Sequence, residues 1–171
     1  MLRSLVGSEM CIRDSFKEMT AMRARGHHIE AICQPRALLV ERLSDAGFTV
    51  HKVAMDGPVN YLKGVAAVRG ILKEGRFDVL NTHSRRDTVI AALAARLAGT
   101  PLIVRTRHLS NKVGSMWSYT CLPHRVTTVS DHVREYLIER GVPANKVATV
   151  YSPIVLPPPC LLYTSPSPRD S

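Results

Sequence analysis

The sequence lacks the long apolar segments that membrane-spanning and secreted proteins carry. No stretch approaches the roughly 18–20 consecutive apolar residues that a membrane-spanning helix needs. The first residues, Met1 to Ser15, include Glu9 and Asp14 and therefore lack the uninterrupted apolar core of a secretory signal. We expect a cytoplasmic protein.

Motifs for metals, disulfides and nucleotides are also missing. The chain has four cysteines, but they are widely scattered and none forms a C-x-x-C pair, so neither a zinc site nor a disulfide framework is indicated. We expect Cys33 and Cys121 to be small buried side chains. The sequence contains no phosphate-binding P-loop, no G-x-G-x-x-G turn and no metal-ligand cluster. We expect no cofactor and no metal.

Acidic and aromatic residues are scarce relative to basic ones. The chain of 171 residues has 23 Lys and Arg against 14 Asp and Glu, a formal charge of +9, and only 5% aromatic residues. A basic surface attracts phosphates, anionic lipid or nucleic acid. Because the predicted strands are poor in aromatics and no base-stacking motif is present, we expect no nucleic-acid partner. A stand-alone basic anion-binding module remains an alternative function.

The two ends of the chain show neither helical nor strand periodicity. Residues 1–15 and 157–171 both close on Arg-Asp-Ser, and the second run is rich in proline, which excludes a regular element. Both resemble translated sequencing-adapter read-through. We therefore expect artefactual or disordered tails at 1–15 and 157–171, around one folded domain at 16–156 cut from a longer gene.

Between these ends, short apolar runs alternate with segments of 3.6-residue periodicity. This alternation predicts a Rossmann-like parallel sheet with helices on both faces and right-handed crossovers. Because the first predicted element is a helix, we expect the first strand and its glycine-rich turn to be missing. The expected strands are 29–33, 48–55, 77–82, 102–106, 125–129 and 146–151, and the expected helices are 16–25, 37–46, 61–74, 84–98 and 131–140. Residues 109–119 are expected to form a loop with a weak helical turn.

Polar side chains follow several of these strands, where ligands of open parallel sheets bind. Two histidines are the main candidates, because a neutral imidazole can hydrogen-bond a hydroxyl group or accept its proton. Two of the serines would primarily cap helices, and the arginines would supply fixed positive charge for an anion. The candidates are His83, Ser84, Arg85, Arg86, Arg107, His108 and Ser130.

The residues around these positions resemble those of family 4 glycosyltransferases. Asp78 to Ser84, followed by Ala91 to Pro101, is similar to the family's D-V-x-x-x-H-S and A-A-R-L-A-G-x-P motifs. Val104 to Ser110 is similar to an R-T-R-H strand end, and Val126 to Val147 to the segment before the interdomain crossover. The resemblance covers roughly 16–156. Where the family has Asn-Gly or Thr-Gly after the last strand, this chain has Ser152-Pro153.

This resemblance implies the N-terminal half of a GT-B fold, in which two Rossmann-like domains face each other across a cleft. It implies His108 as the catalytic residue at the cleft, and a metal-independent reaction with a nucleotide-sugar donor. The acceptor would be a lipid-linked or polysaccharide glycan, with peripheral contact at the inner membrane face. The acceptor-binding residues would be His83, Ser84, Arg85, Arg86, Arg107 and Ser130.

The donor-binding C-terminal domain is expected to be missing, so this fragment is expected to be inactive alone. A fragment of a sugar-nucleotide epimerase with the same fold is a second interpretation. Paired carboxylates seven residues apart in the downstream sequence would favour the transferase.

Overall fold

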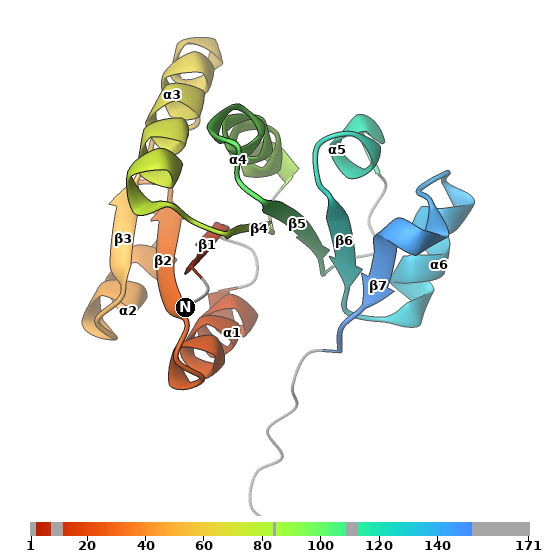
Figure 1. The fold of residues 1–171 in the computed structure, drawn as a ribbon, viewed down its shortest axis with the longest axis horizontal. Coiled ribbons are helices and arrows are strands. Elements are labelled where there is room, and N and C mark those ends of the chain that lie inside the picture. The colour runs from red at the N-terminus through yellow and green to blue at the C-terminus, as the bar shows by residue number, and fades with distance from the viewer. Residues whose placement is uncertain (1–2, 8–11, 84, 109–112, 152–171) are drawn as a thin grey trace, which may run out of the picture.

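The computed structural model describes residues 3–7, 12–83, 85–108 and 113–151. These residues form a parallel sheet with the strand order β3-β2-β1-β4-β5-β6-β7 (Figure 1). The strands are β1 (Arg3–Gly7), β2 (His28–Cys33), β3 (Thr49–Lys52), β4 (Val79–Thr82), β5 (Leu102–Arg107), β6 (Arg125–Thr128) and β7 (Val147–Thr149). The helices are α1 (Ile12–Ala24), α2 (Leu38–Asp45), α3 (Pro58–Gly75), α4 (Arg85–Ala98), α5 (Trp117–Thr120) and α6 (Asp131–Glu139), with a 3-10 turn η1 (Ala144–Lys146).

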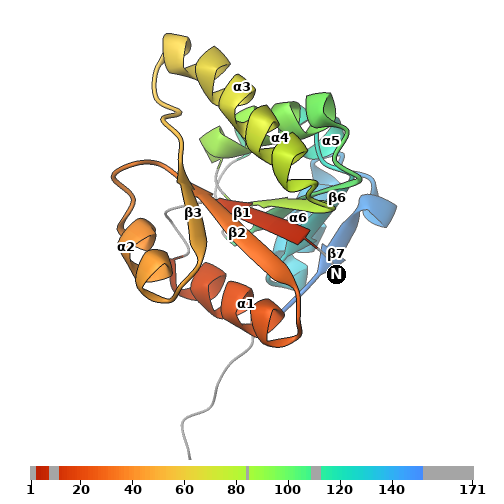
Figure 2. The same ribbon diagram turned by 60° about the vertical axis from the view of Figure 1, so that its left-hand side comes forward.

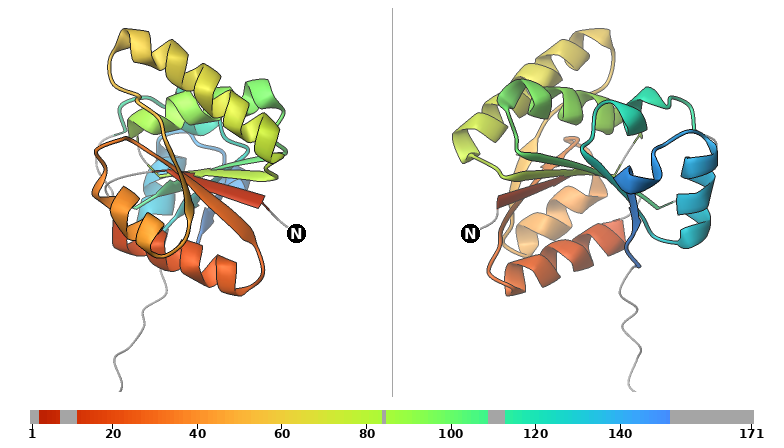
Figure 3. Two further views of the ribbon diagram at one scale, coloured as in Figure 1. Left: turned by 90° about the vertical axis from the view of Figure 1, so that its left-hand side faces the viewer. Right: turned by 45° about the vertical axis from the view of Figure 1, so that its right-hand side comes forward.

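Helices cover both faces of the sheet. The turned views show α1 and α2 against one face and α3 and α4 against the other (Figures 2 and 3). This arrangement follows from right-handed crossovers between parallel strands, since the chain covers one face through α1 and α2 and, after β3, the other face through α3 and α4. The predicted fold class, a parallel α/β sheet covered on both faces, is confirmed.

The first strand is present, contrary to the sequence-based expectation. β1 pairs in parallel with both β2 and β4, placing Leu5 opposite Glu30 on one side and Leu80 on the other. β1 has only five residues and no alternation of apolar and polar side chains, so the sequence indicated the strand too weakly. A central strand of this kind is stabilised by its two neighbours rather than by its own pattern. Residues 3–7 are therefore not a tail, and α1 begins at Ile12, inside the segment expected to be one.

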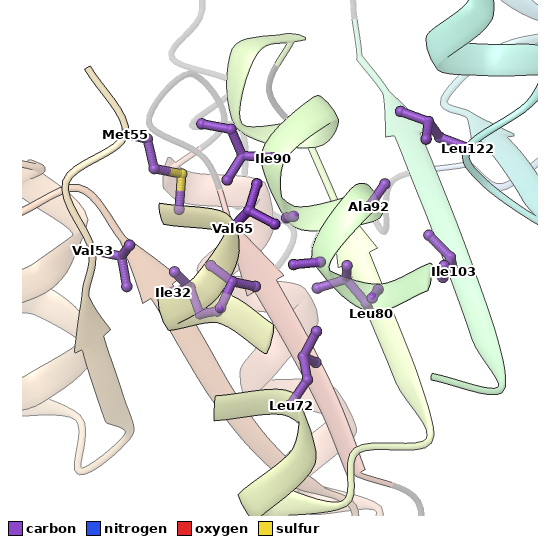
Figure 4. Packing of buried hydrophobic residues seen from close by; sticks show 14 of the residues in the cluster. Ile32, Val53, Met55, Val65, Leu72, Leu80, Ile90, Ala92, Ile103 and Leu122 are labelled. Atoms are coloured by element: carbon purple, nitrogen blue, oxygen red, sulfur yellow. The ribbon is translucent and has the colours of Figure 1, made fainter. Parts of the chain in front are cut away.

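The two faces of the sheet carry separate apolar cores. On the α3 and α4 face, Leu80 and Ile103 from neighbouring strands pack with Val65, Leu72 and Ile90 from the two helices (Figure 4). Complete burial of such a side chain stabilises the fold by about 1.5–3 kcal/mol. On the α1 and α2 face, residues such as Met19, Ile29 and Leu43 form a second core. The sheet is thus fixed in position from both sides.

Two expectations concern short segments. A weak helical turn was expected within the loop over 109–119, and residues 117–120 form the short helix α5, in which Ser118 and Tyr119 are buried. Cys33 is buried as expected, but Cys121 is exposed at the end of α5. The exposure of Cys121 depends on which side of a four-residue helix faces the sheet, and local sequence does not indicate this.

The carboxylate of Glu30 joins β2 to its neighbour β3, an edge strand of the sheet. Glu30 of β2 accepts hydrogen bonds from His28 Nε2 at 2.7 Å and from His51 Nε2 of β3 at 2.6 Å. The ring of His28 also stacks on Phe77. Burial favours the neutral acid, but the hydrogen bonds from His51 and His28 outweigh it and hold the pKa of Glu30 below its ordinary value.

Replacing Glu30 tests this link. Glu30→Gln should lower the free energy of unfolding at pH 7 by about 1–3 kcal/mol, since one imidazole N–H loses its acceptor. A carboxyl with a lowered folded-state pKa stabilises the fold above its unfolded-state pKa and loses this effect as the pH falls through the folded-state value. In urea unfolding series, the difference from the parent chain should therefore shrink below about pH 4. A difference independent of pH would contradict the assignment.

Truncation tests the position of β1. Deleting residues 1–10 removes the strand between β2 and β4, so cooperative thermal unfolding should be lost or strongly weakened. Deleting 157–171 is the control and should leave the unfolding transition of the described elements unchanged. Equal behaviour of the two truncated proteins would show that β1 does not contribute to the sheet.

Candidate functional site

Two histidines meet where β4 and β5 end. His83 directly follows β4 and His108 directly follows β5, and the strands pair with Thr82 opposite Arg105. His83 Nδ1 lies 2.9 Å from His108 Nε2, and the rings stack with their centroids 5.2 Å apart. Both side chains are partly buried. The structure thus brings together the two candidate histidines that the sequence analysis placed at this edge.

The environment of His83 keeps its ring neutral. Burial, together with the neighbouring His108, lowers the pKa of His83 to about 3. His83 Nε2 is buried without a hydrogen-bond partner among the described residues. One of the two facing nitrogens, His83 Nδ1 or His108 Nε2, donates its proton to the other, and the tautomers of the rings determine which one.

This contact couples the two rings chemically, because a single proton lies between His83 Nδ1 and His108 Nε2. The tautomer of one ring therefore determines that of the other. Such a pair can accept or donate a hydrogen bond to a hydroxyl group.

Arg107 lies inside the protein rather than at the open edge. It is 8% exposed and donates from a terminal nitrogen to the hydroxyl of Tyr119. Arg105, two residues earlier on the same strand face, donates to the carbonyl of Ser118 at 2.9 Å and lies over the Tyr119 ring at 3.5 Å. These contacts anchor α5 on β5 and hold the strand that ends at His108. The role of Arg107 in binding an acceptor stays a prediction.

The remaining sequence candidates are helix-terminal residues. Ser130 caps α6 as expected, since its Oγ accepts a hydrogen bond from the backbone N–H of Val133 at 3.4 Å. Arg85 and Arg86 form the first turn of α4, and Ser84 lies outside the described residues. The start of α4 therefore follows His83 closely, and free backbone N–H groups at a helix start favour anions.

A row of polar side chains crosses the α1 face of the sheet and was not anticipated. Asn81 Nδ2 donates to Glu18 of α1 at 3.3 Å, and Asn81 Oδ1 accepts from Thr106 Oγ1 at 2.9 Å. Thr106 Oγ1 in turn lies 2.8 Å from Thr127 Oγ1. Three neighbouring strands are thus joined to α1 near the edge that carries the histidines. The polar residues within otherwise apolar strands were the feature of the sequence that could have indicated this row.

No group of three or more His, Cys, Asp or Glu side chains among the described residues is placed to hold a metal ion. None of the helices in the described part of the chain is both long and apolar enough to cross a membrane.

Comparison with known proteins decides the family. Residues 17–153 match the model of the glycosyl transferase 4-like domain. The chain belongs to this family. Within this glycosyltransferase domain, the His83 and His108 pair lies at the edge where the resemblance of the sequence placed the cleft.

The similarity extends to a curated enzyme and to solved structures. The chain is 28% identical over 99 residues to the UDP-Gal:alpha-D-GlcNAc-diphosphoundecaprenol alpha-1,3-galactosyltransferase of Escherichia coli, covering 56% of this chain and 26% of that protein. A glycosyltransferase from Rickettsia africae superposes with a TM-score of 0.72 at 18% identity, over 88% of this chain and 42% of its own. The UDP-N-acetylglucosamine 2-epimerase of Rickettsia bellii gives 0.67 at 15% identity, over 89% and 45%.

The chain matches only part of the length of each of these proteins. The chain spans about a quarter of the curated relative and less than half of each solved neighbour. The two solved neighbours include one transferase and one epimerase, so the likeness in structure establishes the GT-B type of domain and does not separate the two activities.

An NMR titration tests the state of His83. In ¹⁵N spectra of the imidazoles, His83 should remain neutral from pH 8 to pH 5 and take up a proton only near about 3. The His83→Gln protein identifies the resonance. If His83 instead titrates near the ordinary value of about 6.5, its ring is exposed to water and the pairing with His108 is wrong.

Proposed function

We propose that this domain is the acceptor-binding half of a glycosyltransferase that moves a sugar from a nucleotide-sugar to a hydroxyl group of a lipid-linked or polysaccharide acceptor. The observation that carries the proposal is the hydrogen-bonded pair of His83 and His108 at the carboxyl edge of the sheet. Family membership supplies the reaction class. The pair supplies a place for the acceptor hydroxyl.

His108 is the residue that we assign to the acceptor hydroxyl. It follows the longer of the two strands, two positions beyond the residue opposite His83, and so extends further toward the open edge. His83 is the positioning residue, because its hydrogen bond through Nδ1 holds the ring of His108 and links the tautomers of the two rings. Among the remaining candidates, Ser84, Arg85 and Arg86 at the start of α4 would bind an anionic group of the acceptor.

The chemistry of the curated relative supports the acceptor class. The printed name of that enzyme specifies a UDP-sugar donor and a sugar linked through diphosphate to undecaprenol. An acceptor of this class has a hydroxyl group to be glycosylated, a diphosphate and a long lipid chain. The histidine pair would bind the hydroxyl group, and the nearby helix start would bind the diphosphate.

Exposed apolar side chains support peripheral contact with the inner membrane face, where the lipid chain would reside. Leu38 is 78% exposed, Leu62 74% and Trp117 50%. Leu38 and Leu62 lie at or near the start of a helix that follows a strand, so both are at the carboxyl edge together with the histidine pair, whereas Trp117 begins α5, just before β6. The chain has a formal charge of +9, which suits an anionic membrane surface.

We further propose that the chain does not transfer sugar by itself. The donor site of the family is expected in a second domain, and the chain spans only 26% of the curated relative's length. An epimerase parent is the alternative. An epimerase acts on a nucleotide-sugar alone and needs no acceptor, so acceptor binding by the isolated domain separates the two interpretations.

Vesicle binding is the direct test. The chain should cosediment with vesicles of phosphatidylcholine that contain undecaprenyl-diphosphate-GlcNAc, and more strongly when phosphatidylglycerol is added. His108→Gln should weaken the acceptor-dependent part about three- to tenfold, as loss of one hydrogen bond of ~0.5–1.5 kcal/mol predicts. The part that depends on phosphatidylglycerol should not change.

His27→Gln is the matched control, since His27 precedes β2 at the opposite edge of the sheet, and it should bind like the parent chain. No transfer of galactose from UDP-galactose is expected from the chain alone. The proposal would be contradicted, and the epimerase favoured, if vesicle binding does not depend on the glycolipid and the chain binds UDP-N-acetylglucosamine saturably.

A further inference from the structure

Four basic side chains gather at the amino edge of the sheet, opposite the histidine pair. Arg96 lies in the last turn of α4, His124 and Arg125 at the start of β6, and Lys146 at the end of η1, immediately before β7. We call Arg96, His124, Arg125 and Lys146 the Arg96 cluster. They come from three separate segments of the chain, and the parallel sheet brings them together.

Part of the cluster has a structural role. Arg96 Nε donates to the carbonyl of Leu122 at 2.9 Å, and a terminal nitrogen donates to that of Cys121 at 3.2 Å. Lys146 Nζ donates to the carbonyl of Thr120. Three successive carbonyls that follow α5 are satisfied in this way. These bonds account for one side of Arg96 and for one proton of Lys146.

The contact between Arg96 and His124 is not explained by this role. The backbone N–H of Ile103 donates to His124 Nδ1 at 3.0 Å, so the proton of the neutral ring belongs on Nε2. His124 Nε2 lies 2.7 Å from a terminal nitrogen of Arg96, which has no lone pair to accept it. Two N–H donors therefore face each other without an acceptor between them.

The charges of the cluster are not balanced within the described part of the chain. No carboxylate of a described residue forms an ion pair with Arg96, Arg125 or Lys146, and both ion pairs found among these residues belong to Glu30. Burial, followed by the positive charges of Arg96, Lys146 and Arg125, lowers the pKa of His124. Burial, followed by Arg96 among the cations, also lowers the pKa of Lys146.

We propose that the Arg96 cluster binds the phosphoryl group of a phosphate-bearing ligand. An anionic oxygen that separates Arg96 from His124 Nε2 would accept an N–H group from each, and Lys146 and Arg125 would supply further charge to the same anion. The site lies at the edge of the sheet opposite the proposed acceptor site. It is therefore a second site, and it does not rest on the proposed transferase function.

A phosphate titration tests the proposal. Sodium pyrophosphate added to the ¹⁵N-labelled chain should shift the ring signals of His124 and the side-chain signal of Arg96 saturably. Lys146→Gln and Arg125→Gln should each weaken binding about tenfold, as the loss of one charge-assisted contact predicts. Lys17→Gln, an exposed lysine on α1 at the other face of the sheet, is the matched control and should bind like the parent.

Arg96→Gln removes bonds to the loop after α5 and can destabilise the fold, so the Arg125→Gln protein is the decisive variant. Within the described part of the chain, the side chain of Arg125 donates one hydrogen bond, to the neighbouring carbonyl of His124, so its loss disturbs the fold less. If pyrophosphate shifts the parent and Arg125→Gln proteins equally, or leaves the His124 signals unchanged while other sites respond, the proposal is overturned.

A second arm identifies the source of the phosphoryl group. If pyrophosphate binds saturably and the chain shows no Arg125-dependent cosedimentation with phosphatidate vesicles, the ligand is a soluble phosphate ester. Cosedimentation on phosphatidate vesicles that is lost in Arg125→Gln and competed by pyrophosphate assigns a lipid headgroup.

Discussion

In the register of β4 and β5, Thr82 lies opposite Arg105, and the chemistry at the carboxyl edge depends on this pairing. Parallel strands end at the same edge, so the residue after β4 and the residue after β5 meet there. The apolar core beneath them, with Leu80 and Ile103 on these two strands, holds the register. A slip of one residue would turn Leu80 and Ile103 away from the core, and the imidazoles of His83 and His108 would no longer meet.

The buried residues around this edge stabilise the same geometry. Arg105 and Arg107 hold Tyr119 against β5, and the hydrogen bonds from Glu18 through Asn81 and Thr106 to Thr127 join α1 to three strands. Charge and polarity are therefore distributed between two edges of one sheet. The carboxyl edge carries the hydrogen-bonded histidine pair, and the amino edge carries the Arg96 cluster, where several positive charges lie close together.

Much of the fold followed from the sequence, because strands and helices that alternate in this chain have clear periodicities and glycine or proline at their ends. The edge that carries His83 and His108 could be predicted for the same reason. The contacts of individual side chains could not be predicted in this way. Whether Arg107 faces a ligand or Tyr119 depends on how a four-residue helix packs, and β1 is a strand because β2 and β4 flank it. The local sequence pattern indicates neither fact. The origin of the two terminal runs as foreign sequence stays a prediction.

The central claim is that the histidine pair at the carboxyl edge receives the hydroxyl group of a glycan acceptor. A crystal structure of the chain with a soluble GlcNAc-diphosphate-lipid analogue measures this directly. The account predicts a sugar hydroxyl within hydrogen-bond distance of His108, with His83 Nδ1 still bonded to His108 Nε2. An analogue bound away from both histidines, or a His83 ring turned out to solvent, would contradict it.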